Sequence, residues 1–311
     1  MLSGHPSCTP KTKEKVLQAA QELAYYPNHL AKRLRQQRSG TFIAVFSDIR
    51  NPVFADMMQG IEDVAYKNGY DMLIGNSGNS LEREEDYLRG FLSRKVDGVL
   101  LITPRVDLRQ VSALARRLPL VLINEPRAPE DIPCVGIDDF AAVFELTERV
   151  IALGYRRLAY ISGDNAGIAA RRREGFEAAV SRHKLEDGAT ILSGGSGMGH
   201  GVEGMRALSK LPQLPQCVIC YNDEVAIGAI KQAQESGLRM PQDIAFCGFD
   251  DIYTAGLPWP SLTTVRQPAC EIGAHAAGML VDLQRGNPLP AQKVNLPYEL
   301  RIRSSTPRLG G

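Results

Sequence analysis

Residues 217–251 read CVICYNDEVAIGAIKQAQESGLRMPQDIAFCGFDD. Two apolar runs, 217–221 and 244–249, flank a segment in which Val225/Ala226, Ala229/Ile230 and Ala233 recur at helical spacing. The apolar runs do not alternate with polar residues, which is typical of strands covered on both faces. The stretch therefore predicts a strand–helix–strand unit of a parallel α/β sheet.

The same alternation extends over most of the chain. Further apolar runs occupy 41–47, 71–75, 97–102, 119–123, 134–137, 157–162 and 189–192. Helical patterns lie between them, such as Phe54, Met57, Met58 and Ile61, and a later one runs from Ile272 to Leu283. Nine strands exceed one ordinary sheet, so we predict two similar, doubly wound α/β lobes that divide near residues 137–139.

Polar residues follow these runs at their carboxyl ends. They are Asp48, Asn76, Ser77, Thr103, Asn124, Asp138, Ser162, Asn222 and Asp250. Ligands of open α/β sheets bind outside the carboxyl ends of the strands. Any one of these residues is also what an ordinary loop would contain, but the whole set predicts a cleft for a small molecule with many hydrogen-bonding groups.

Composition excludes several classes of protein. The chain has 311 residues, of which 44% are hydrophobic and 23% charged, and its net charge is +1, which excludes a disordered or collagen-like chain. It contains no run of about 18 apolar residues that would span a membrane. It also has no apolar signal-peptide core at its N-terminus, so we expect a cytoplasmic protein with no membrane partner.

The charge is distributed unevenly. Residues 1–40 contain seven Lys or Arg and two acids, whereas the remaining 271 residues contain 29 basic and 33 acidic groups. A basic N-terminal segment on a mildly acidic body fits either a polyanion partner or a solvated terminus.

Motifs that would indicate an enzyme or a metal site are weak. Cys217 and Cys220 have CxxC spacing but lie in an apolar run, and no second pair completes a metal site, so we interpret them as core residues. The glycine pattern GHGVEG, residues 199–204, fits a dinucleotide fingerprint on paper, yet it lies in a longer glycine-rich run. We therefore expect no catalytic residues, no metal and no cofactor.

The order of the motifs resembles the lactose-repressor/galactose-repressor (LacI/GalR) family of bacterial transcription regulators. The resemblance covers essentially the whole chain. It rests on TPKTKEKVLQAAQELAYYPN, DIRNPVFADMMQGIEDVAYKNGYDMLIGNS, RKVDGVLLI, VGIDDFAA, LGYRRLAYISG, RRREGFEAAV, PSLTTVRQP and ELRIRSST, together with residues 221–251.

This resemblance implies a periplasmic-binding-protein-like fold of type I, with three crossovers between the lobes. Residues 1–40 would form a partial headpiece and hinge helix. Residues 41–138 and 267–290 would form the first lobe, and residues 139–266 and 291–311 the second. The protein would form homodimers or tetramers, with the helix at 53–69 near the interface.

The resemblance also implies a role for the basic segment. Residues 28–37 would form a hinge helix with Asn28 as its N-cap. Ala31 and Leu34 would share one face, with Leu34 as an apolar wedge in the minor groove, and Lys32 and Arg35 would contact phosphates. The chain begins at MLSGHPSC, which matches the loop after the family's recognition helix, so we expect the first two headpiece helices to be missing and operator reading to be lost.

Carried over residue by residue, the family's effector site would consist of Phe54, Asn76, Ser77, Asn124, Asp138, Arg172, Asn222 and Asp250. The expected function is a ligand-responsive, DNA-binding transcription regulator, a repressor, whose partners are operator DNA and a sugar, sugar acid or nucleoside. Two alternatives are a sugar-binding protein without a DNA role and an oxidoreductase built around residues 199–204. The basic segment argues against the first alternative.

Overall fold

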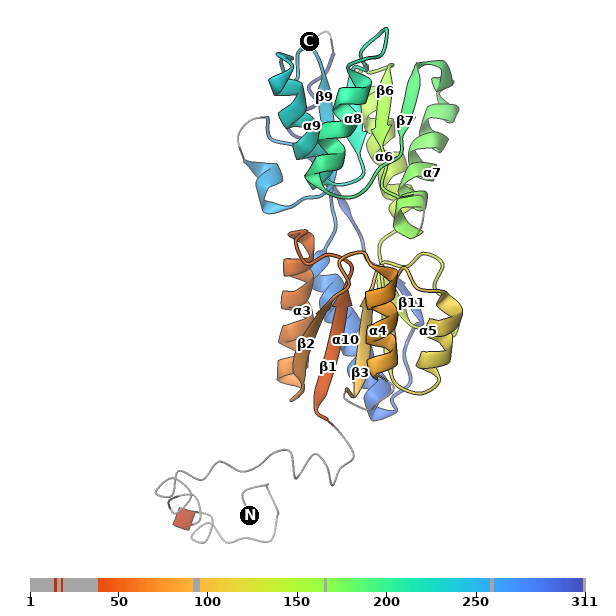
Figure 1. Cartoon of the computed structure of the whole chain (residues 1–311), viewed down its shortest axis with the longest axis vertical. Coiled ribbons are helices and arrows are strands. Elements are labelled where there is room, and N and C mark those ends of the chain that lie inside the picture. Colours follow the sequence, from red (N-terminus) through yellow and green to blue (C-terminus); the bar gives the residue numbers. More distant parts are fainter. Residues whose placement is uncertain are drawn as a thin grey trace.

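The computed structural model describes residues 14, 15, 18, 39–91, 96–164, 167–257 and 260–309. They form two lobes arranged along the long axis of the molecule (Figure 1). The predicted hinge residues Asn28, Ala31, Lys32, Leu34 and Arg35 lie outside the described residues, so the hinge stays a prediction.

The first lobe is built on a six-stranded sheet whose described strand pairs are all parallel. Its strands, in spatial order, are β11 (Lys293–Asn295), β5 (Cys134–Gly136), β4 (Leu120–Ile123), β3 (Gly98–Ile102), β1 (Thr41–Phe46) and β2 (Asp71–Asn76). Successive residues of β1 enter opposite cores: Phe42, Ala44 and Phe46 one, Ile43 and Val45 the other. Both faces of the sheet are therefore covered, which explains why its strands read as continuous apolar runs.

Helices pack on the two faces of this sheet. α3 (Val53–Lys67) and α10 (Ala269–Arg285) contribute to one core, and α4 (Leu81–Phe91) and α5 (Leu108–Ala115) to the other. α3 and α10 approach closely because each has a glycine at the contact. A Cβ on Gly60 would lie 1.9 Å from the Cys270 carbonyl oxygen, and one on Gly273 would lie 2.2 Å from that of Met57.

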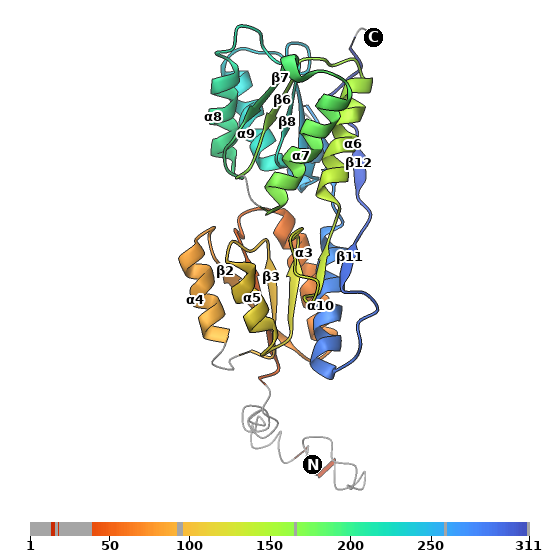
Figure 2. The ribbon, with the colours of Figure 1, turned by 90° about the vertical axis from the view of Figure 1, so that its right-hand side faces the viewer.

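The second lobe repeats the architecture with one difference. Its sheet has the order β12 (Glu299–Arg301), β10 (Thr263–Arg266), β9 (Ala245–Asp250), β8 (Cys217–Cys220), β6 (Leu158–Ile161) and β7 (Ala189–Leu192), and β12 is antiparallel to β10. The sheet lies among α6 (Asp139–Ala152), α7 (Gly167–Arg182), α8 (Met198–Leu208) and α9 (Asp223–Glu235) (Figure 2). Short 3-10 helices occupy Glu186–Gly188 and Tyr253–Gly256.

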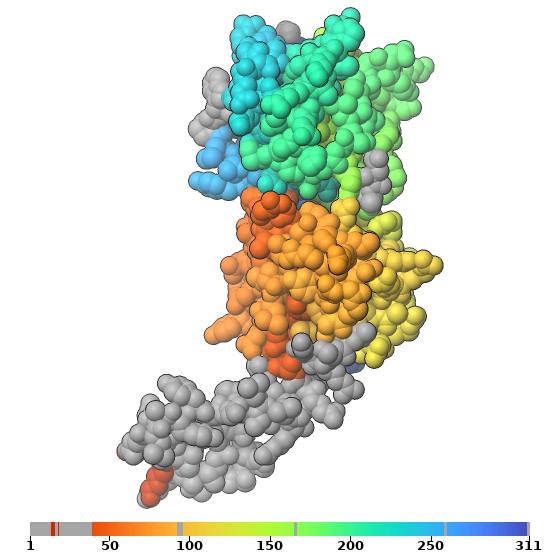
Figure 3. All heavy atoms as spheres, viewed as in Figure 1, coloured from red at the N-terminus to blue at the C-terminus, as the bar shows by residue number. Residues whose placement is uncertain are grey.

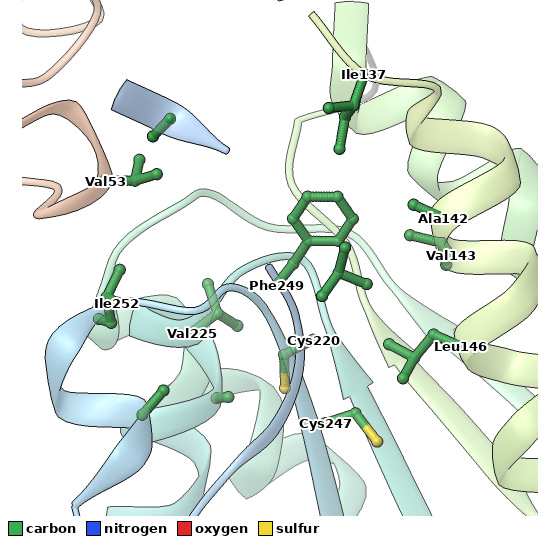
Figure 4. Packing of buried hydrophobic residues seen from close by; sticks show 14 of the residues in the cluster. Val53, Ile137, Ala142, Val143, Leu146, Cys220, Val225, Cys247, Phe249 and Ile252 are labelled. Carbon is green, nitrogen blue, oxygen red and sulfur yellow. The ribbon is translucent and has the colours of Figure 1, made fainter. Parts of the chain in front are cut away.

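The cysteines of the CxxC pattern are core residues, as interpreted from the sequence. Cys217 and Cys220 are both buried, and Cys220 lies with Cys247 and Phe249 in the apolar packing beneath α6 (Figure 4). The described residues hold no group of three or more His, Cys, Asp or Glu side chains placed to bind a metal ion. Within the described ranges, no helix combines the length and the apolar character that crossing a bilayer requires.

The nine predicted strands and the two lobes are confirmed, and three crossovers join the lobes. The predicted lobe boundary after residue 290 is wrong in one respect. β11 pairs in parallel with β5 of the first sheet, so the chain returns to the second lobe only between Asn295 and Glu299. The glycine motif at 199–204 lies inside α8, where a Cβ on Gly201 would lie 1.9 Å from the Val225 carbonyl oxygen of α9. Gly201 therefore serves helix packing, whereas a Cβ on Gly204 would meet the Ile161 side chain of β6 at 2.8 Å and one on Gly199 would meet no atom within 4 Å.

Candidate functional site

A cavity of about 770 Å³ lies between the lobes, at the level where they meet in the space-filling view (Figure 3). The first lobe contributes residues that follow β1, β3 and β4, together with Asn79 after β2. The second contributes the last residue of β9 and residues that follow β6, β7, β8 and β10. The cavity thus lies outside the carboxyl ends of both sheets, where ligands of open α/β sheets bind. Its volume suits a small metabolite.

Five of the eight predicted effector residues line this cavity: Phe54, Asn124, Arg172, Asn222 and Asp250. Asn76, Ser77 and Asp138 are not among the described lining residues, and the strand order explains this. β2 is the edge strand, so Asn76 and Ser77 lie to one side, where Ser77 donates to the Phe46 carbonyl oxygen. β5 lies on the far side of β4, and Asp138 caps α6 by accepting from the Ala141 N–H at 3.0 Å.

Arg172 is the largest fully buried side chain of the described residues, and its guanidinium is already engaged. Its Nε donates to Asp139 Oδ1 at 2.7 Å, and its Nη1 donates to the Tyr221 carbonyl oxygen at 2.9 Å. The guanidinium carbon also lies 3.5 Å from the centroid of the Phe249 ring. We infer that Arg172 fixes the floor of the cavity, since Asp139 holds its Nε and the Tyr221 carbonyl oxygen holds an N–H of its Nη1.

Asp250 lies at the end of β9 and faces both lobes. Its Oδ1 accepts from Gln267 Nε2 at 2.6 Å, and its Oδ2 accepts from Asn51 Nδ2 of the first lobe at 3.5 Å. Burial raises the pKa of Asp250 to about 6, although the nearby Arg172 charge and these two hydrogen bonds act in the opposite direction. Oδ2 has only the long contact to Asn51 and therefore retains capacity for a donor from a ligand.

Several cavity residues have left-handed backbone. Thr103 has φ 47°, Asn124 has φ 53° and Asp250 has φ 112°, and each ends a strand at the cavity. Such conformations cost roughly 1–3 kcal/mol each and cluster at ligand sites, where the surrounding structure holds them. Three such backbone positions therefore lie at this one cavity.

Asn222 has a positioning role. Its Oδ1 accepts from the Val225 N–H at 2.9 Å as the N-cap of α9, and its Nδ2 donates to the Ser196 carbonyl oxygen at 2.9 Å. It thereby joins two wall segments of the second lobe, the start of α9 and the loop before α8. Loss of this amide would affect a ligand through that loop as well as directly.

Two polar contacts cross between the lobes at the cavity. Arg105 Nη1 lies 2.7 Å from Asp164 Oδ2, and Asn51 reaches Asp250 as described above. The backbone of Arg105 is itself held, because the buried Glu84 accepts its N–H at 2.9 Å. These contacts join the two lobes across the cavity.

Sequence reasoning missed several lining residues, among them Arg105, Glu125, Asp164, Glu224 and Gln267. Gln267 follows β10, a strand too short and polar to stand out in the sequence. Asp164 lies two residues after Ser162, the polar residue that was predicted to end the run at 157–162. Glu224 lies in the first turn of α9, two residues after Asn222, which was predicted as the polar end of a strand.

Comparisons with known proteins agree with this arrangement. The model of the periplasmic binding protein-like domain matches residues 147–306. The HTH-type transcriptional repressor CytR of Escherichia coli K12 is 31% identical over 298 residues, which are 95% of this chain and 87% of that protein. A LacI family transcriptional regulator from Enterococcus faecium, solved with bound ribose, superimposes with a TM-score of 0.79 at 27% identity, covering 86% of this chain and 99% of that one.

The lac repressor dimer bound to operator and an anti-inducer has a TM-score of 0.85 and covers 98% of this chain and 92% of its own. Its identity of 23% supports the fold alone. The whole-chain likeness to CytR extends far beyond a shared fold, since it covers both lobes at 31% identity. With two lobes, three crossovers and a cavity at the carboxyl ends of both sheets, the chain belongs to the LacI family of transcription regulators.

Proposed function

We propose that the protein is a ligand-responsive DNA-binding repressor that acts in the cytoplasm. A small polar metabolite would bind in the cavity between the lobes and change the affinity of the protein for operator DNA. The observation that carries this proposal is the cavity itself, which both lobes line and which polar contacts span. Family membership supplies the DNA partner.

The mechanism rests on closure of the lobes. A ligand that bonds to residues of both lobes stabilises the closed arrangement more than an open one, and so shifts the population toward closure. β1 begins at the end of the first lobe away from the cavity (Figure 1). There the Ser39 and Gly40 N–H groups each donate to the Asp97 carboxylate at 2.7 Å. Asp97 therefore attaches the segment that precedes β1 to the first lobe. A conformational change at the cavity would reach that segment through the first lobe.

We further propose that the protein acts as a homodimer, in line with the family. Leu73 and Ile74 on the edge strand β2 are half exposed, at 50% and 51%. Beside them a mainly apolar groove of about 380 Å³ is lined by Leu73, Tyr87 and Phe91, among others. An apolar edge strand of this kind requires cover in a soluble protein, and a second copy would provide it.

A ligand screen followed by a DNA titration tests the regulator function. Sugars, sugar derivatives and nucleosides are screened by thermal shift, where a hundredfold excess over Kd adds about 2.7 kcal/mol to the free energy of unfolding. DNA fragments from upstream of the gene are then titrated by fluorescence anisotropy with and without the hit. A ligand that leaves DNA affinity unchanged, or a protein that binds none of these fragments, would indicate a binding protein without a DNA role.

The hinge gives a further prediction, which rests on the family resemblance because Leu34 lies outside the described residues. Leu34→Ala should weaken operator binding, since the DNA kink loses its apolar wedge. Effector affinity should stay the same, because residue 34 precedes both lobes. Gel-shift titration measures the first and calorimetry the second. Unaltered operator affinity would exclude the wedge role.

A further inference from the structure

We propose that the effector carries no net negative charge and presents hydrogen-bond donors to Asp250 and Glu224. This inference refines the proposed function and rests on it. Of the three ligand classes that the sequence left open, it retains neutral sugars and nucleosides and rejects sugar acids. Phosphorylated compounds are rejected on the same ground.

The cations of the cavity are already paired. Four arginines line it, and each lies within salt-bridge distance of a carboxylate. Arg50 lies 2.6 Å from Asp48, Arg105 lies 2.7 Å from Asp164, Arg127 lies 2.9 Å from Glu125, and Arg172 lies 2.7 Å from Asp139. The Arg172–Asp139 pair is buried, so an anionic ligand that took this guanidinium would leave a buried carboxylate unpaired. The other three arginines are at least 42% exposed, and their pairs contribute little.

The carboxylates outnumber the cations. Five carboxylates line the cavity, and Asp139 behind Arg172 makes six against four guanidinium groups. Glu224 has no hydrogen-bond or salt-bridge partner within the described residues, and Asp250 has Arg172 only at 3.9 Å. Burial raises the pKa of Glu224, and the neighbouring Asp250 and Asp48 charges raise it further, while the Arg50 charge acts in the opposite direction. The two surplus carboxylates thus face the same part of the cavity.

Helix N-termini at the cavity act in the opposite direction and must be weighed. α3, α7, α8 and α9 all begin at or beside it, and each end carries about half a positive charge. However, the first turn of α9 holds Asp223 and Glu224, and Asn51 Oδ1 accepts the Val53 N–H at the start of α3. α8 begins without a side-chain cap at Gly197. Its N–H groups can be satisfied by a hydroxyl or ring oxygen, which requires no anion.

The polar capacity that remains fits a donor-rich ligand. Asp250 Oδ2 and the Glu224 carboxylate accept only, so they need O–H or N–H groups from the ligand. Sugars and nucleosides supply such donors without a negative charge. An amine also fits, since it places a positive charge beside the two surplus carboxylates.

Matched pairs of compounds that differ in charge test the proposal. Ribose is compared with ribose 5-phosphate, glucose with gluconate and adenosine with its 5′-monophosphate, with glucosamine as a cationic member. Melting temperatures are measured first, and calorimetry follows for each pair in which one member stabilises the protein. We expect at least one neutral or cationic member to bind, and its anionic counterpart to bind at least tenfold more weakly.

An anionic member that binds as tightly as its neutral counterpart would overturn the charge rule and leave the regulator function standing. A panel in which no neutral or cationic member binds would overturn this proposal, and the DNA titration would decide separately on the regulator function.

A variant that replaces a carboxylate by a neutral amide then tests which residue causes the discrimination against anionic ligands. Glu224→Gln should reduce the discrimination within the responding pair about tenfold, because one of the two surplus charges is removed. Glu235→Gln, at the other end of α9 and 3.7 Å from Lys231, removes a carboxylate outside the cavity and should leave the discrimination unchanged. Equal discrimination in the parent and in Glu224→Gln would overturn the role of Glu224.

Discussion

Asp250 can accept a hydrogen bond from a ligand, yet its buried environment disfavours its negative charge. Burial raises its pKa from an ordinary 3.8 to about 6, so between these values the folded protein binds the proton more tightly than the unfolded chain does. The free energy of unfolding should therefore decrease as pH rises from about 4 to 6. Asp250→Asn should remove this contribution, which urea denaturation at pH 4.5 and 7.5 measures.

The exposed Asp131→Asn serves as its control for the loss of a carboxylate. If Asp250→Asn kept the full pH dependence of the parent, the carboxyl would not be the buried titrating group. Donors from the ligand would favour the ionised form of Asp250. Effector affinity should accordingly rise with pH through about 6.

The Arg172–Asp139 pair yields a stability prediction. Arg172→Ala leaves the buried Asp139 without its partner at 2.7 Å, and loss of one member of a buried pair typically costs about 3–5 kcal/mol. Urea denaturation of Arg172→Ala, Asp139→Asn and the double variant measures the coupling. The double variant should be more stable than Arg172→Ala. Independent, additive losses would contradict the pairing.

At the scale of single residues, the sequence identified the polar residues at the strand ends but not the contacts that each of them makes. Polar strand ends can be read from the sequence, but the cavity includes only some of them. Strand order is a property of the assembled sheet, so Asn76 and Asp138 could not be separated from Asn124 and Asp250. The pairing of Arg172 with Asp139 joins α7 to α6, and no local pattern records it.

Among the elements, the contact of α3 with α10 is the most sensitive to side-chain size. Gly273→Ala would place a methyl group 2.2 Å from the Met57 carbonyl oxygen, so the helices must separate, and we expect a loss of about 1–3 kcal/mol. Gly278→Ala in the same helix meets no atom within 4 Å and should stabilise the protein by about 0.5–1 kcal/mol. Thermal denaturation compares the two variants. Equal effects would show that α10 is not held by this close approach.

Elements with two covered faces were predictable, and marginal ones were not. The nine apolar runs each gave a strand, and in the central strands burial on both faces explains the continuous apolar sequence. The edge strands β2 and β7 are only partly buried but retain the apolar pattern. β10, β11 and β12 were missed. They have three or four residues each, and their sequences TTVR, KVN and ELR carry one large apolar residue apiece. Such strands form because neighbouring strands present free edges, which a local pattern does not reveal.

For the whole molecule, three chain crossings join the lobes. The segment preceding β1 is attached to the first lobe through Asp97, at the end away from the cavity. We therefore expect a ligand to change DNA affinity by moving one lobe against the other. Contacts that span the cavity set the balance between open and closed arrangements.

The Arg105–Asp164 contact should favour the closed arrangement. It joins the lobes at 2.7 Å, but both side chains are nearly half exposed, so the pair is worth at most about 1 kcal/mol, or roughly fivefold in population. Arg105→Ala should weaken the identified effector severalfold, mainly through faster dissociation, as stopped-flow fluorescence measures. Arg109→Ala breaks a pair with Asp107 inside the first lobe and should leave the effector unaffected. If the two variants weakened binding equally, the loss would reflect surface charge, and the closing role of Arg105 would be excluded.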